Sequence, residues 1–191
     1  MAMGNEGNNG IAAGTRRTIL AGYMEKNNGG DKLKYRIISV GKIREKFYRE
    51  GIREYLKRMG PYGSFEFLDG LEEKVSPHPS EKEIEKVLHK EGERILSLLG
   101  DNEMLIALDI QGERYSSEQL AQQLREWNQS GRPRVNFVIG ASHGLAPAVK
   151  QRADRSISFS PLTFPHQMAV LILSEQIYRG FKILKGEPYH K

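Results

Sequence analysis

The stretch FSPLTFPHQMAVLIL, residues 159–173, joins a loop rich in Pro, Ser and Thr to a segment that is apolar at consecutive positions. Pro165 stands where the first turn of a helix tolerates proline, and Gly186 is a typical C-terminal stop, so we expect a final helix that runs to about Lys185. Because a helix that is apolar all round needs cover on several sides, it should run deep inside the domain or form a subunit interface. An ordinary core helix is the plainer alternative.

Upstream of this stretch, strand-like and helix-like patterns alternate along the chain. The expected strands are 35–42, 64–70, 104–112, 135–144 and 155–159. The expected helices are 43–59, one that starts after Ser80, one that starts after Ser116, and 145–153. Such alternation predicts an α/β fold, with a mostly parallel sheet and helices on both faces.

Length and composition indicate one domain. The chain has 191 residues, and residues 1–31 are rich in Gly and Asn without a sustained apolar period. We interpret 1–31 as a disordered extension or a remnant of protein expression, and 32–191 as the folded domain.

The chain has no cysteine, and it lacks both a membrane-span pattern and a secretory signal pattern. We therefore expect a protein of the reducing cytoplasm with no membrane partner. The five histidines are scattered rather than paired with acids at metal-ligand spacing, so we expect no metal site.

Positive charge is concentrated near the start of the domain. Residues 34–62 carry nine Lys or Arg against three Glu, whereas residues 66–118 carry fourteen acids against six bases. A basic face attracts polyanions such as RNA, although a solvated helix surface would give the same pattern.

Three expected strands end in loops of small or uncharged residues: LDIQG (108–112), IGASHG (139–144) and FSPLTF (159–164). In open α/β sheets, ligands lie outside the carboxyl ends of the strands. Glycine at any one loop could simply make a tight turn, but three such loops favour a ligand. No Gly-x-Gly-x-x-Gly and no phosphate loop with Lys-Ser or Lys-Thr is present, which favours an adenosine-bearing cofactor without phosphate.

Several motifs together carry a family resemblance: VGKIREKFYREGIREYLKRMGPY near the domain start, VIGASHGL (138–145), FSPLTFPHQM (159–168) and EQIYRGFKILKGEPYHK (175–191). Across residues 33–191 the chain resembles the bacterial 23S rRNA (pseudouridine-N3)-methyltransferase family, part of the SPOUT superfamily of knotted methyltransferases. The resemblance implies S-adenosyl-L-methionine as cofactor, held in a C-terminal deep trefoil knot, and a homodimer formed through the final helix.

The resemblance also implies which residues bind the cofactor. The matching positions are Leu108, Gly140, Phe159, Ser160, Pro161, Leu162, Thr163 and Phe164. The chain departs from many relatives at two positions: Ala141 follows Gly140 where they have a second glycine, and Val170 stands where they have an arginine early in the final helix.

For catalysis we expect the C-terminal tail of one subunit to complete the site of the other, with His190 as base and Tyr189 contacting the target base. Fraying of the terminus is the alternative. Methylation of a pyrimidine at C5 usually employs a thiol, and this chain has none, so a nitrogen or oxygen acceptor is expected.

The RNA substrate should be a large assembled ribosomal surface, because the basic face is small. The candidates for phosphate contact are Lys42, Arg44, Lys46, Arg49, Arg53 and Lys57. Two other functions stay open at this point: a SPOUT enzyme that methylates a ribose hydroxyl or a guanine nitrogen, and a non-enzymatic RNA-binding module.

Overall fold

The computed structural model describes residues 34–189, which form a five-stranded sheet in the order β2-β1-β4-β3-β5. The strands are β1 (Lys34–Ser39), β2 (Ser64–Asp69), β3 (Met104–Arg114), β4 (Val135–Ile139) and β5 (Arg155–Ser158). Every neighbouring pair of strands is parallel. The parallel sheet predicted from the alternating pattern is thus confirmed.

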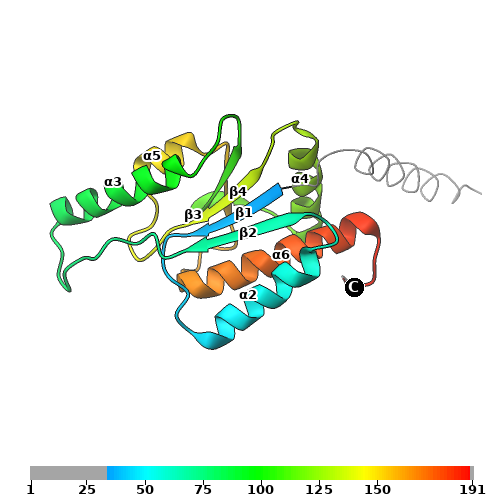
Figure 1. Cartoon of the computed structure of the whole chain (residues 1–191), viewed down its shortest axis with the longest axis horizontal. Coiled ribbons are helices and arrows are strands. Elements are labelled where there is room, and N and C mark those ends of the chain that lie inside the picture. Colours follow the sequence, from blue (N-terminus) through cyan, green and yellow to red (C-terminus); the bar gives the residue numbers. More distant parts are fainter. Residues whose placement is uncertain (1–33, 190–191) are drawn as a thin grey trace, which may run out of the picture. The chain divides into compact units, whose positions relative to one another are not determined.

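Helices cover both faces of this sheet, as Figure 1 shows. The helices are α2 (Lys46–Met59), α3 (Glu81–Ser97), α4 (Ser117–Gln129), α5 (Pro147–Arg152) and α6 (His166–Lys185). Apolar side chains of α2, α4 and α6 share one core cluster with one face of the sheet. Side chains of α3 and α5 share a second cluster with the other face.

The final helix α6 lies inside the larger of these two layers. Val170, Leu173 and Ile177 are completely buried there. At Gly180 the helix comes so close to α4 that an added Cβ would overlap the Leu124 side chain. The sheet, α2 and α4 therefore supply cover on several sides, which explains the apolar composition of this helix.

Local signals set the ends of the helices. Ser116 and Gln119 form a capping box at the predicted helix start, because each side chain accepts the backbone N–H of the other residue. Ser80 accepts the Glu83 N–H, but the Glu83 carboxylate bonds the backbone N–H and hydroxyl of Ser76 instead of closing the box. Gly186 ends α6 with a positive φ of 64°, as predicted.

One apolar residue of α2 lies outside the core. Phe47 keeps 60% of its surface exposed. Tyr48 packs against the core in its place. Adjacent helical residues point in directions about 100° apart, so only one of the two can face the sheet.

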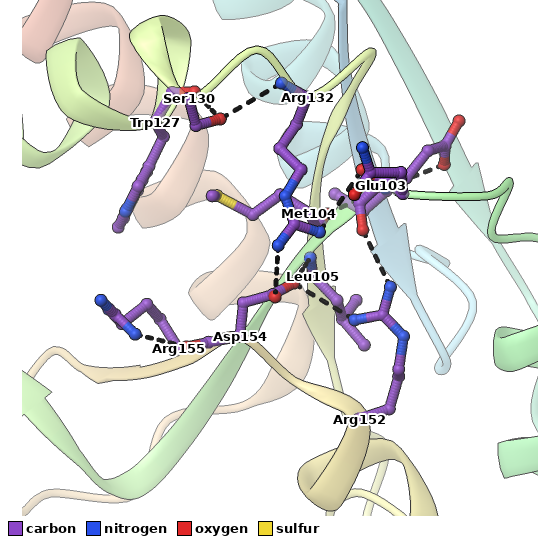
Figure 2. A network of polar contacts seen from close by, with 11 residues as sticks. Glu103, Met104, Leu105, Trp127, Ser130, Arg132, Arg152, Asp154 and Arg155 are labelled. Atoms are coloured by element: carbon purple, nitrogen blue, oxygen red, sulfur yellow. Dashed lines mark hydrogen bonds and ion pairs between the residues drawn. The ribbon is translucent and has the colours of Figure 1, made fainter.

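A polar network ties the strands together at the amino edge of the sheet (Figure 2). The Asp154 carboxylate accepts the Leu105 N–H at 2.9 Å and lies 3.2 Å from the guanidinium groups of Arg132 and Arg152. Burial acts to raise the pKa of Asp154, but these bonds and charges outweigh burial and lower it. The network fixes the start of β5 beside β3.

Two predictions concern residues that the structure does not describe: the interpretation of 1–31 and the role of His190. Among residues 34–189, no helix is both long enough and apolar enough to cross a bilayer.

Candidate functional site

A cavity of about 570 Å³ opens where β4 and β5 end and β3 bends. It is lined by all three loops that the sequence singled out. Seven of the eight predicted cofactor residues line it: Leu108, Gly140, Phe159, Ser160, Leu162, Thr163 and Phe164. Pro161 is exposed and is not part of the wall.

A bend in β3 shapes the first wall of the cavity. Leu108 pairs with Ile157 of β5, and so does Glu113, so the intervening residues bulge out of the ladder. Gly112 passes so close to β5 that an added Cβ would lie 2.5 Å from the Ile157 carbonyl carbon. The bulge turns Asp109 and Ile110 toward the cavity.

The second wall is a tight turn after β4. An added Cβ at Gly140 would lie less than 3.0 Å from the Gly144 carbonyl oxygen. The turn is closed by the Gly144 N–H, which donates to the Ala141 carbonyl at 3.0 Å. Gly144 itself has a φ of 79°, which favours glycine. Gly140 is therefore required for this turn to close.

The third wall is the loop between β5 and α6, whose own side chains hold its shape. The Ser158 hydroxyl donates to the Ser160 carbonyl at 3.1 Å, and the Ser160 hydroxyl accepts the Leu162 N–H at 2.9 Å. Phe159 and Phe164 meet edge to face with ring centroids 6.3 Å apart. Such internal bonding means that a ligand would meet a largely preformed loop.

His166 links the cavity wall to the basic segment of the chain. Its Nε2–H donates to the Lys42 carbonyl oxygen at 3.1 Å. Gly41 leaves room for the imidazole, since an added Cβ there would lie 2.6 Å from Nε2. This arrangement supports the structural role that its place at the helix start suggests.

The cavity wall carries one acid and one base. Among the lining residues that the structure describes, only Asp109 and Lys150 are formally charged at neutral pH, and their Oδ2 and Nζ atoms are 2.5 Å apart. Burial acts to raise the pKa of Asp109, but the Lys150 hydrogen bond, the Gln111 N–H and the Lys150 charge outweigh burial and lower it. Asp109 is therefore ionised at neutral pH.

Sequence reasoning did not single out this pair. Asp109 falls within the first predicted loop, but Lys150 was counted only as part of a short helix. The alternation of strands and helices places the start of that helix near the end of β4, but this pattern alone does not distinguish Lys150 from other exposed lysines. Within residues 34–189 no three His, Asp or Glu side chains are grouped to hold a metal ion.

All six predicted RNA-contact residues are exposed. Four of them lie on one side of α2, because their spacing repeats after three, seven and eleven residues: Lys46, Arg49, Arg53 and Lys57. We call these four residues, with Lys42 and Arg44, the basic stripe. Gln167 of α6 accepts the Arg44 N–H at 2.7 Å, so the stripe begins beside the start of α6 at the cavity.

Tyr189 packs on α6 of its own chain and does not line the cavity. Its hydroxyl donates to Glu175 at 3.1 Å, its ring meets Tyr178 edge to face, and the Arg179 guanidinium lies 4.9 Å from its centroid. Burial, followed by hydrogen bonding and nearby negative charge, raises the pKa of Tyr189. Val170 is completely buried, so its side chain is not available to a substrate.

Comparison with known proteins identifies the family. The family model described as predicted SPOUT methyltransferase matches residues 33–190. The ribosomal RNA large subunit methyltransferase H of Syntrophomonas wolfei subsp. wolfei is 64% identical over 159 residues, which cover 83% of this chain and 100% of the relative. The protein of the same name from Streptococcus thermophilus (strain ATCC BAA-491 / LMD-9) is 46% identical over the same coverage.

A solved structure shares the fold. It is a probable methylase family protein from Haemophilus influenzae Rd KW20, with a TM-score of 0.50 and 14% identity, covering 83% of this chain and 71% of the other. The resemblance drawn from the sequence motifs is thus confirmed, and this chain is a member of the SPOUT methyltransferase family.

Proposed function

We propose that this protein transfers the methyl group of S-adenosyl-L-methionine to N3 of a pseudouridine in 23S rRNA. It acts in the cytoplasm on assembled large ribosomal subunits, as a homodimer. The single observation that carries the proposal is the meeting of all three predicted loops at one cavity of about 570 Å³.

The cavity suits an adenosine-bearing donor. Its volume falls in the range of about 300–1,000 Å³ that is typical of small-molecule sites. Its walls combine apolar side chains with glycine and serine backbone, which lets main-chain groups approach a flat neutral ring. We also propose that the C-terminal third forms the deep trefoil knot, since that topology would enclose the donor between these loops.

The bound cofactor supplies an electrophilic methyl group on a sulfonium centre. The protein's task is then to align the acceptor nitrogen with that methyl, and alignment alone is worth about 7 to 11 kcal/mol in favourable cases. The chain contains no cysteine, which closes the thiol-adduct route to pyrimidine C5 and favours attack by nitrogen.

The C-terminal tail completes the site in trans in this proposal. Tyr189 contacts α6 of its own chain and does not line the cavity of that chain. The tail of a second subunit, bound through α6, would bring His190 to the acceptor nitrogen as base. General base assistance of this kind typically supplies about 10²- to 10⁴-fold in rate.

The basic stripe would hold rRNA at the mouth of the cavity. Its residues are exposed, and its first residue, Lys42, contacts His166 on the cavity wall. The stripe is short, so contacts with an assembled subunit would supply the rest of the affinity.

The proposal is tested with purified large subunits and free 23S rRNA, each incubated with radiolabelled S-adenosyl-L-methionine and the protein. Nucleoside mass spectrometry should find methylated pseudouridine in the subunits and little in free rRNA. Label in a ribose or a guanine, or no transfer to either RNA form, would refute the assignment.

A further inference from the structure

The formal charge on the described wall of the cavity comes from one pair of side chains. Within residues 34–189, Asp109 and Lys150 are the only formally charged residues that line the cavity, and they belong to different elements, the β3 bulge and α5. The Asp109 side chain is 11% exposed and the Lys150 side chain 45%. The rest of the wall offers backbone, hydroxyl, imidazole and apolar groups.

A methyl donor built on methionine also carries an anionic and a cationic group close together. Its adenosine end is neutral, whereas its amino-acid end carries an α-ammonium and an α-carboxylate. Desolvating such a zwitterion is costly unless each charge meets a partner of opposite sign. A cavity for this donor therefore needs one anionic and one cationic group close together.

We propose that Asp109 and Lys150 form the subsite for the amino-acid end of the donor, with the Asp109 carboxylate taking the α-ammonium and the Lys150 ammonium taking the α-carboxylate. This inference rests on the proposed function. In the absence of the donor, the two side chains satisfy each other at 2.5 Å. On binding, one internal ion pair is replaced by two charge-assisted contacts to the ligand.

The surroundings of Asp109 support this role. Its Oδ1 atom accepts the Gln111 N–H at 3.0 Å, so the carboxylate is held in place by the bulge even when Lys150 moves away. Lys150 is the more exposed and flexible partner, and it can swing from Asp109 to the ligand. The fixed Asp109 carboxylate can therefore bind the α-ammonium of the donor while the Lys150 side chain moves to its α-carboxylate.

Three probes separate the parts of the donor. S-adenosylhomocysteine keeps the amino-acid end but lacks the sulfonium charge, whereas 5′-methylthioadenosine lacks the amino-acid end. Calorimetry with Asp109→Asn and Lys150→Met should show affinity for S-adenosylhomocysteine reduced about 10- to 100-fold, with affinity for 5′-methylthioadenosine unchanged. S-adenosyl-L-methionine should weaken in parallel with S-adenosylhomocysteine.

A second ion pair provides matched controls. Lys90 of α3 lies 3.6 Å from Glu73, with side-chain exposures of 48% and 20%, and neither residue lines the cavity. Lys90→Met and Glu73→Gln should leave the affinity for all three probes unchanged. The charge swap Asp109→Lys with Lys150→Asp restores an ion pair but should not restore S-adenosylhomocysteine binding, because the zwitterion would meet like charges.

Other outcomes overturn the inference. If the single variants lost affinity equally for S-adenosylhomocysteine and 5′-methylthioadenosine, the ion pair would have a purely structural role. The same conclusion would follow if the charge swap restored the affinity for both compounds. A loss confined to S-adenosyl-L-methionine in Asp109→Asn would place the carboxylate at the sulfonium instead. If the unaltered protein bound none of the three probes, the proposed function itself would fall.

Discussion

His166 donates its Nε2–H to the backbone carbonyl of Lys42, and this 3.1 Å bond joins the wall of the cavity to the first residue of the basic stripe. The two residues are 124 positions apart in the chain. Through this contact the start of α6 and the segment before α2 hold one position relative to each other. The proposed cofactor site and the proposed RNA surface therefore share a fixed boundary.

We predict that His166 positions this boundary and does not take part in chemistry. His166→Phe keeps an aromatic ring but loses the N–H donor of a solvent-exposed bond, which should lower the free energy of unfolding by about 0.5 to 1.5 kcal/mol. The pH profile of methyl transfer should keep its shape, because no titrating catalyst is removed. Thermal melting measures the change in stability, and the rate of methyl transfer from pH 5 to 9 measures the pH profile. Loss of the acid limb of that profile in a normally stable variant would contradict the prediction.

Gly140 should tolerate no larger side chain. Gly140→Val would place its Cβ against the Gly144 carbonyl, so the turn after β4 must open and displace a wall of the cavity. We expect at least a tenfold loss of S-adenosylhomocysteine affinity with the circular dichroism spectrum retained. Gly60→Ala is the control, since its added Cβ would meet only the Lys57 carbonyl at 3.2 Å. Equal affinity in both variants would argue against a ligand at this turn.

The basic stripe should govern methylation of ribosomal subunits without affecting cofactor binding. Arg53→Glu and Lys57→Glu lie on the exposed side of α2, away from the cavity. We expect each to weaken subunit binding and to reduce the slope of log affinity against log salt by about one. Lys86→Glu on α3, on the other face of the sheet, is the matched control. If all three variants behaved alike, overall charge rather than the stripe would be responsible.

The acid limit of stability should depend on Asp154. Its pKa is lowered in the folded chain, so its contribution to stability is complete above the ordinary Asp pKa of about 3.9 and is lost as the pH falls through the lower folded value. Asp154→Asn should therefore lower the melting temperature at pH 7 and flatten its decline below about pH 4. Melting curves from pH 3 to 7 test this. An unchanged acid slope in the variant would show that other carboxylates set the limit.

The sequence allowed the layers of the fold and three loops of the site to be predicted for identifiable reasons. Apolar alternation places strands and helices, and parallel strands bring their carboxyl ends to one edge, so the loops at 108–112, 139–144 and 159–164 had to lie near one another. Ser116 and Gly186 mark helix ends through backbone bonding that depends only on local residues.

The features that could not be predicted depend on tertiary contacts. The register shift that turns Asp109 into the cavity arises between β3 and β5, which are distant in the sequence. Lys150 resembles any exposed lysine until α5 is placed beside that bulge. Likewise, the position of Tyr189 follows from its contacts with Glu175 and Tyr178 on the far side of a turn, and no periodic pattern encodes them.

The C-terminal tail should be essential for methyl transfer and dispensable for cofactor binding. Deleting residues 189–191 should abolish turnover on large subunits while S-adenosylhomocysteine affinity stays measurable. Tyr189→Phe loses the hydroxyl bond to Glu175 but keeps the ring against Tyr178 and Arg179, so it should retain part of the activity. Full turnover by the truncated protein would remove the tail from the mechanism.

A crystal structure of the protein with S-adenosylhomocysteine tests the central claim most directly. The account predicts the adenosine between the Gly140 turn and the 159–164 loop, in a knotted C-terminal third, with a second subunit packed on α6. A ligand bound elsewhere on the protein, or an unknotted chain around the cavity, would contradict it.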